Sequence, residues 1–251
     1  MIHIKNTEDI KLMKIAGRIT GEALCLGGEA VKEGVSTKHI DDIIRSHIEK
    51  CGAKPSFLGY GGFPASACIS INDEVIHGIP SKDRIIKDGD IVKIDVGACY
   101  QGFNGDSANT FICGNGTEEA KRLIQATKEA FYKGADFARA GCRVGDIGSA
   151  IDSHVQTYGY SVVRKYIGHG VGRELHEDPE VPNFGKAGHG PRLLRGMTLA
   201  IEPMVNLGGA AILQLNDGWT VKTRDGKLSA HYENTILITD GEPEILTAPA
   251  I

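Results

Sequence analysis

Two aspartates in one short stretch of the chain could act together chemically. Asp95 lies inside the apolar run Ile91–Val96, which is typical of a β-strand, and Asp106 follows eleven positions later. Aspartate is uncommon in strands and is rarely buried without a partner. The glycines between the two acids predict a turn, and Ser107–Cys113 predicts a return strand. Such a hairpin brings two repelling carboxylates side by side, where they need shared protons or cations.

The elements that must hold this hairpin can be predicted from capping residues and apolar periodicity. Helices are expected from Thr7, as the N-cap, towards Val31, from Ser36 or Thr37 to Gly52, over Glu118–Ala138 and over Gly145–Tyr158. Further strands are expected at Cys68–Asn72, Ser161–Tyr166, Met197–Val205, Ala210–Leu215, Trp219–Thr223 and Ala230–Thr239. This mixture predicts an α+β fold in which helix pairs pack against strands.

The two halves of the chain resemble each other at a shift of 107 positions (141 − 34). At this shift Gly34, Ile44, His47, Gly52, Gly89 and Asp95 meet Gly141, Ile151, His154, Gly159, Gly196 and Glu202. We infer an internal duplication, roughly residues 8–113 and 117–240. Asp106 and Glu233 are 127 positions apart (233 − 106), so the second half carries about twenty extra residues, and Gly208–Asp225 predicts a hairpin there.

A pseudo-twofold relation between the halves would bring four carboxylates together: Asp95, Asp106, Glu202 and Glu233. Four negative charges in a dry site need compensation, and two divalent cations bridged by carboxylates would supply it. His169, between Gly168 and Gly170, is the candidate nitrogen ligand. One imidazole with four carboxylates suits Mn, Fe or Co better than a structural zinc site.

Each of these residues also has an ordinary interpretation. A single aspartate in a strand is commonly ion-paired at a solvated edge, and a Gly-His-Gly sequence is commonly only a turn. The register that links Asp95 to Glu202 favours the metal site, because it relates the acids to one another.

Composition excludes several classes of function. The net charge of −4 and the pI near 6.1 are unlike those of a protein that binds nucleic-acid phosphates. No apolar run is long enough to span a bilayer, and the N-terminus lacks the apolar region of a signal peptide. The six cysteines are scattered without a C-x-x-C pair, which indicates reduced thiols and a cytoplasmic protein.

The chain as a whole, from about Ile4 to Thr247, resembles the type I, bacterial-like methionine aminopeptidases. The resemblance rests on the five candidate ligands and on four flanking motifs: Ser70–Pro80, Gly168–Gly172, Ile201–Asn206 and Asp217–Val221. It implies one catalytic domain over residues 1–251, with the pita-bread fold of two related α/β halves around a dinuclear metal centre.

The resemblance also implies residue roles. Asp95 would hold one metal ion, His169 and Glu202 the other, and Asp106 and Glu233 both. The reaction would remove an N-terminal methionine that precedes a small residue, through a water that bridges the two ions. Glu202 would be the general base, while His77 and His176 would contact the substrate beside the scissile amide.

An apolar slot for the methionine side chain is implied as well. Its residues would be Tyr60, Phe63, Cys68, His77 and Trp219, with Phe57 and Leu175 at further pocket positions. Phe57 and Leu175 depart from the small residue and the phenylalanine common in the family, so the exact shape of the slot differs. Asn72, Glu74 and Ser229 match positions that hold Na or K in relatives.

The implied cofactors are therefore two divalent ions, Co, Mn, Fe or similar, with Na or K at a structural site. The implied partners are nascent polypeptides and, in the cell, the ribosome, for a monomeric enzyme that contacts neither membrane nor nucleic acid directly. Two alternatives stay open. One is an Xaa-Pro aminopeptidase or prolidase, although these usually carry a large extra N-terminal domain. The other is a non-catalytic binding protein on the same fold, although such proteins typically lose metal ligands.

Overall fold

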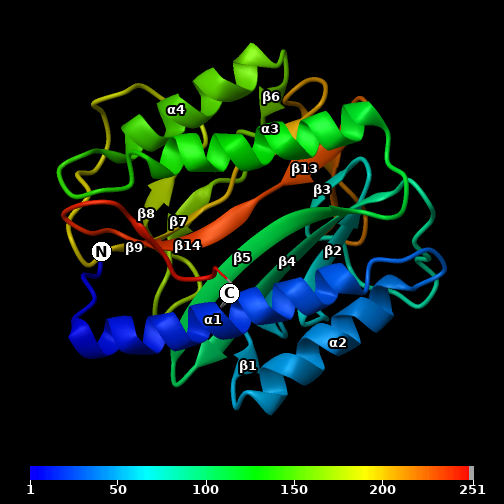
Figure 1. Cartoon of the computed structure of the whole chain (residues 1–251), viewed down its shortest axis with the longest axis horizontal. Coiled ribbons are helices and arrows are strands. Elements are labelled where there is room, and N and C mark those ends of the chain that lie inside the picture. Colours follow the sequence, from blue (N-terminus) through cyan, green and yellow to red (C-terminus); the bar gives the residue numbers. More distant parts are fainter. Residues whose placement is uncertain (249–251) are drawn as a thin grey trace.

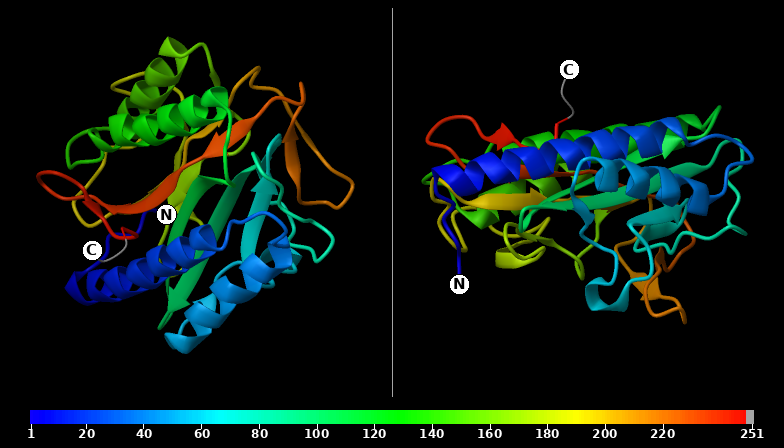
Figure 2. Two further views of the ribbon diagram at one scale, coloured as in Figure 1. Left: turned by 45° about the vertical axis from the view of Figure 1, so that its right-hand side comes forward. Right: turned by 90° about the horizontal axis from the view of Figure 1, so that it is seen from below.

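Two pairs of helices cover one face of a curved antiparallel sheet in the computed structural model, which describes residues 1–248 (Figure 1). The helices are α1 (Thr7–Glu29), α2 (Thr37–Lys50), α3 (Glu118–Ala135) and α4 (Val144–Thr157), with a short 3-10 helix η1 (Tyr60–Gly62). Figure 2 shows the helices on one side of the sheet, with long loops and small hairpins on the other. In this part of the chain, no helix has both the length and the apolar character needed to cross a membrane.

The main sheet runs through strands of both halves of the chain. Its order is β1 (Lys54–Pro55), β4 (Ile91–Tyr100), β5 (Phe103–Ile112), β14 (Glu233–Leu237), β9 (Thr198–Ile201), β7 (Gly168–Gly170) and β8 (Glu177–Val181). Strand β2 (Ala67–Ile71) also pairs with β4, and β15 (Glu244–Ile245) with β14. Two small sheets consist of β13 (Ser229–His231), β10 (Met204–Asn206) and β6 (Ser161–Val162), and of β11 (Ile212–Gln214), β12 (Val221–Thr223) and β3 (Glu74–Ile76).

The N-cap of helix α1 lies one residue earlier than predicted. Asn6, and not Thr7, is the N-cap: its side chain accepts hydrogen bonds from the backbone N–H groups of Glu8 and Asp9. The Asp9 carboxylate accepts the Asn6 N–H in return, which completes a capping box. The prediction of Thr7 was wrong because both residues are good caps, and only Asn6 has an acid three positions further on.

The β4–β5 hairpin is longer than the sequence predicted. Its turn is at Gln101 and Gly102, whose φ angles are 48° and 81°, so the return strand starts at Phe103 rather than at Ser107. The other two glycines expected in the turn lie within the strands. Gly97 leaves room for Phe57, whose ring atoms would lie 2.8 Å from an added Cβ.

Alternation along the strands separates the core from the face that carries the acids. Ile94 and Val96 are fully buried against α1 and α2, while Ile201 and Ile236 are buried against α3 and α4. Because successive side chains of a strand point to opposite faces, Asp95 is turned away from the helices. The helix pairs thus support the sheet from behind, and the other face is left for a site.

Several strands predicted as single elements are interrupted. Met197–Val205 divides at Pro203 into β9 and β10, and Ala230–Thr239 divides at Tyr232 into β13 and β14. Proline cannot donate to a ladder, which accounts for the first break. The hairpin predicted between Gly208 and Asp225 is present as β11 and β12.

The structure also contains features that support the proposed duplication. Each of the three glycine pairs related by the 107-residue shift has positive φ in both members: Gly34 and Gly141, Gly52 and Gly159, Gly89 and Gly196. His47 lies 3.2 Å from Glu22, and His154 lies 3.2 Å from Glu129 at the same shift. The equivalent helix pairs therefore share both their end geometry and a side-chain contact.

Candidate metal centre and substrate pocket

Four acids from neighbouring strands converge on the face of the sheet opposite the helices. Asp95 pairs with Ala108 and Asp106 with Gly97, so the two aspartates are diagonal neighbours on one face, as the hairpin prediction required. Glu233 also pairs with Ala108, on the other side of β5. Glu202 directly follows β9, the next strand beyond β14.

Without bound cations, burial disfavours the ionised form of all four acids. It raises the pKa of Asp95 to about 7. Burial, and then the charges of neighbouring acids, raise the pKa values of Asp106, Glu202 and Glu233 well above their ordinary range. One buried oxygen on each aspartate has no hydrogen-bond partner among the described residues. Such oxygens are free to coordinate a cation.

His169 is oriented towards these acids by its own backbone. Its Nδ1 lies 2.8 Å from the Gly170 carbonyl oxygen, so the ring donates there and leaves Nε2 without a proton. Nε2 faces Asp106 Oδ2 at 3.7 Å and Glu202 Oε1 at 3.5 Å. Burial lowers the pKa of His169 to about 3, which keeps the imidazole neutral as a metal ligand must be.

The glycines beside His169 are required by close packing. A Cβ on Gly168 would lie 2.3 Å from the Ala200 carbonyl oxygen, and one on Gly170 would lie 2.2 Å from the Asp178 carbonyl oxygen. The Gly-His-Gly sequence is therefore a short strand, β7, inserted between β8 and β9, rather than a turn.

His231 is a member of this group that the sequence analysis missed. Its side chain is 1% exposed, and neither ring nitrogen has a hydrogen-bond partner among the described residues. Nε2 lies 3.8 Å from Glu202 Oε2 and 3.7 Å from Glu233 Oε2. Its position two residues before Glu233, at the period of a strand, was the signal that could have revealed it.

These donors fit a pair of divalent cations. At this site, two ligand groups have donor atoms within 4.8 Å of one another: Asp106, His169 and Glu233, and Asp95, His231 and Glu233. Both groups contain Glu233, so this carboxylate stands between two adjacent ligand clusters. Carboxylate oxygens and imidazole nitrogens are donor types that divalent metal ions accept.

A cavity of about 150 Å³ adjoins the acids. It is lined by all of the predicted ligands and pocket residues: Phe57, Tyr60, Phe63, Cys68, His77, Asp95, Asp106, His169, Leu175, His176, Glu202, Trp219 and Glu233. Phe57, Phe63, Cys68 and Leu175 form a buried apolar cluster. The Trp219 ring meets Phe63 edge to face at 5.1 Å between centroids. The cavity therefore has an ionic side and an apolar side.

Two histidines, His77 and His176, also line this cavity. The His176 ring lies 4.3 Å from the His169 ring, and its Nδ1 is 2.6 Å from the Tyr60 hydroxyl. His77 has a φ of 59°, an unfavourable backbone geometry for a residue other than glycine, which is typical of functional positions. Burial lowers the pKa of His77 to about 4, so its ring is neutral.

The positions expected to hold Na or K lie beside a buried ammonium group. The Asn72 carbonyl oxygen accepts hydrogen bonds from Ser229 N–H at 3.1 Å and from Lys93 Nζ at 2.7 Å. Lys93 is only 1% exposed, and burial lowers its pKa to about 7, opposed by the charge of Glu74. The Lys93 nitrogen therefore lies in direct contact with Asn72, one of the three positions expected to hold Na or K.

Replacing Lys93 with methionine should change how stability depends on pH. The native pKa of Lys93 lies below the unfolded value, so protonation costs the native state stability as pH falls from about 10.5 towards 7. The free energy of unfolding of the wild type should therefore fall relative to Lys93→Met over this range, by a few kcal/mol at most. Urea unfolding of both proteins at equal metal loading measures the difference. Parallel pH profiles would contradict the lowering of the Lys93 pKa by burial.

Comparisons with known proteins agree with this geometry. A model of metallopeptidase family M24 matches residues 11–240. A methionine aminopeptidase of Clostridium acetobutylicum is 53% identical over 247 residues, which cover 98% of this chain and 99% of that protein. The crystal structure of methionine aminopeptidase from Thermotoga maritima has a TM-score of 0.97 at 45% identity, over 98% of this chain and 99% of that one.

A prolidase represents the alternative peptidase class. The structure of the enzyme from Pyrococcus furiosus matches with a TM-score of 0.81 at 25% identity, and the match covers 99% of this chain but 66% of the prolidase. The two enzyme classes therefore share the pita-bread fold, as expected from the sequence. The two methionine aminopeptidases match at 53% and 45% identity over nearly their whole length, whereas the prolidase matches at 25% over 66% of its length. The chain therefore belongs to metallopeptidase family M24 and, within it, to the methionine aminopeptidases.

Proposed function

We propose that this enzyme hydrolyses the first peptide bond of polypeptides that begin with methionine followed by a small residue. The observation that carries the proposal is a single cavity whose ionic side can hold two cations and whose apolar side ends in Phe63, Cys68 and Trp219. A thioether side chain suits such a wall, because sulfur packs well against aromatic rings.

The cation ligands in this proposal are Asp95, Asp106, His169, Glu202 and Glu233. When bound, two divalent ions would supply Lewis acidity and a water molecule of lowered pKa. His231 is a further candidate donor, because its bare nitrogens face Glu202 and Glu233. The native metal would depend on cellular supply as well as on these ligands.

Glu202 is proposed as the general base. Its two oxygens face different imidazoles, Oε1 towards His169 and Oε2 towards His231, so the carboxylate is held between two neutral rings. It would take the proton of the attacking water and pass it to the leaving amine. This transfer leaves Glu202 ionised again at the end of the cycle.

His176 and His77 are proposed to position the scissile amide. If the Tyr60 hydroxyl donates to His176 Nδ1, the ring proton lies on Nε2, ready to donate to the developing oxyanion. His77 meets the Trp219 ring edge to face at 6.3 Å, so in this proposal it would lie between the slot and the peptide backbone. It would hold the peptide on the leaving side.

Phe57 and Leu175 are proposed to shape the slot. Both are buried in the same apolar cluster, and Gly97 lets the Phe57 ring approach the β4 backbone next to Asp95. A large residue at one position and a smaller one at the other would redistribute volume within the slot while keeping it apolar. The residue after methionine would be limited by steric exclusion.

A panel of peptides tests the proposal. We expect Met-Ala-Ser to be cleaved after chelation and restoration of Mn, Fe or Co, with Met-Leu-Ser and Ala-Pro-Ser cleaved at least tenfold more slowly. Preference for Ala-Pro-Ser would favour the prolidase class instead. Absence of both metal uptake and cleavage with every ion would favour a non-catalytic binding protein.

The cellular setting follows from the substrate. Nascent chains carry the methionine that this reaction removes, so we propose that the enzyme works as a monomer beside the ribosome in the cytoplasm. Co-sedimentation with ribosomes and the molar mass in solution would test both parts.

A further inference from the structure

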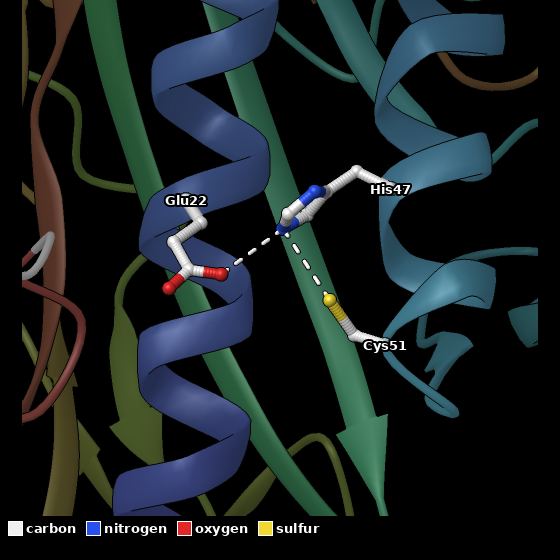
Figure 3. A group of neighbouring side chains, drawn as sticks. All are labelled: Glu22, His47 and Cys51. Carbon is white, nitrogen blue, oxygen red and sulfur yellow. Dashed lines mark hydrogen bonds and ion pairs between the residues drawn. The ribbon is translucent and has the colours of Figure 1, made fainter.

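Three side chains on the helical face of the molecule converge on one point away from the cavity. Glu22 comes from α1, and His47 and Cys51 come from the C-terminal end of α2 (Figure 3). His47 Nε2 lies 3.2 Å from Glu22 Oε2 and 3.6 Å from Cys51 Sγ. All three are partly buried, and their donor atoms lie within 4.8 Å of one another.

Hydrogen bonds leave one contact of this arrangement weak. A protonated Nε2 donates well to the Glu22 carboxylate, but the Cys51 sulfur is a poor acceptor for the same proton. An unprotonated Nε2 can accept from the Cys51 thiol but cannot bond the carboxylate. A cation between the three atoms satisfies all of them, because a bare imidazole nitrogen, a carboxylate and a thiolate are all ligands.

Two of the three separations match those of a tetrahedral zinc site. With Zn–N and Zn–O distances of about 2.0 Å and a Zn–S distance of about 2.3 Å, the tetrahedral edges are about 3.3 Å for N to O and about 3.5 Å for N to S. The two distances to His47 Nε2, 3.2 and 3.6 Å, differ from these edges by about 0.1 Å. The donor atoms of Glu22 and Cys51 lie within 4.8 Å of each other, so side-chain rotation would close the third edge around the ion.

The surroundings also favour a cation. His47 and Cys51 are four positions apart, which aligns their side chains on one helical face. Cys51 is the C-cap of α2, where the helix dipole attracts positive charge. Arg18 lies 3.6 Å from Glu22 Oε1, so it uses the other carboxylate oxygen and leaves Oε2 for the ion.

The second half of the chain provides an internal comparison. Glu129 and His154 repeat the pair at 3.2 Å, but Tyr158 stands where Cys51 would be. The Tyr158 hydroxyl donates to Glu129 Oε2 at 2.8 Å, so hydrogen bonds complete that group. The equivalent pair of helices in the second half thus carries a fully hydrogen-bonded group. In the first half, the third residue is a cysteine, whose sulfur is a soft metal ligand.

We propose that Glu22, His47 and Cys51 bind one borderline-soft divalent cation of the Zn²⁺ class, with water as the fourth ligand. The ion would join α1 to α2 on the helical face. This site is separate from the dinuclear centre, and the inference does not depend on the proposed function.

Residue-resolved alkylation of the full-length protein tests the proposal with Zn²⁺ as the probe. The protein is stripped by a chelator, treated with iodoacetamide with or without Zn²⁺, and mapped by peptide mass. Because a zinc-bound thiolate is a poor nucleophile, Zn²⁺ should slow modification of Cys51 about tenfold or more. Cys25, an exposed cysteine on the neighbouring helix, should react equally fast in both conditions.

Two variants make the test specific. His47→Gln should abolish the protection of Cys51, whereas His154→Gln, the equivalent change in the second half, should leave it intact. Cys51→Ser should lower the zinc content of the dialysed protein by one equivalent, and Cys25→Ser should not. Equal alkylation of Cys51 with and without Zn²⁺, or protection that persists in His47→Gln, would overturn the proposal.

Discussion

Replacing Glu202 with glutamine should lower kcat for Met-Ala-Ser by about 10²- to 10⁴-fold, the usual range for loss of a general base. Glutamine keeps the shape of the side chain but cannot take the proton of the attacking water. It also replaces a carboxylate beside His169 and His231 with a neutral amide. Steady-state kinetics at saturating Mn²⁺ measures the change, and metal analysis of the same samples separates lost chemistry from lost metal.

Glu180→Gln is the matched control for this experiment. Glu180 is exposed on β8, opposite His169 in the strand register, so it lies near the centre without lining the cavity. Its substitution should leave kcat within about twofold, because exposed charges contribute little. A Glu202→Gln enzyme that is fully loaded with metal and retains wild-type kcat would refute the role of Glu202 as base.

Replacing Asp95 with asparagine should stabilise the metal-free protein and destabilise the metal-loaded one. Without cations, the Asp95 charge is buried beside three other acids, and its native pKa of about 7 lies above the unfolded value of 3.8. The ionised carboxylate therefore costs stability above pH 7, and this cost fades as pH falls towards 4, where both states are protonated. The asparagine variant avoids a cost on the order of a few kcal/mol at pH 8.

Urea unfolding in a chelator at pH 8 and pH 5, repeated with Mn²⁺, checks the sign of each effect. The stabilisation by Asp95→Asn should be largest at pH 8 without metal and should reverse when metal is bound, because the variant loses a ligand. Comparing the variant with the wild type at each pH cancels the titration of distant groups, while relief of the repulsion that Asp95 exerts on Asp106, Glu202 and Glu233 adds to the stabilisation. A metal-free variant less stable than the wild type at pH 8 would contradict the electrostatic account of the centre.

The candidate site was more predictable from sequence than the local backbone. Asp95 stood out because a charge inside an apolar strand is rare, and the repeat then connected it with Glu202. The duplication itself and the residue roles stay predictions, although the paired glycine geometries support the first. His231 was missed because an alternating histidine in a strand is indistinguishable, in sequence, from an ordinary core residue.

The wrong predictions of local backbone structure have a physical cause, which is tertiary packing. Gly97 and Gly105 suggested a turn, but each is small because another element packs on it: Phe57 on Gly97, and α1 on Gly105, where an added Cβ would lie 2.9 Å from Gly17. Glycine serves both purposes, and one sequence cannot tell them apart. The burial of Lys93 depends in the same way on a tertiary contact, because its partner is the Asn72 carbonyl oxygen.

The small hairpin β11–β12 affects how the chain folds into its active form. Its strand β12 pairs with β3, joining Val221 to Ile76, and the same insertion carries Trp219 to the Phe63 ring. The wall of the slot therefore forms only when segments very distant in sequence meet, a type of contact that is slow to form. The acids are divided in the same way between the two halves. A chain that has folded only one half should have neither a slot nor a centre, so activity should appear late in folding and in one step.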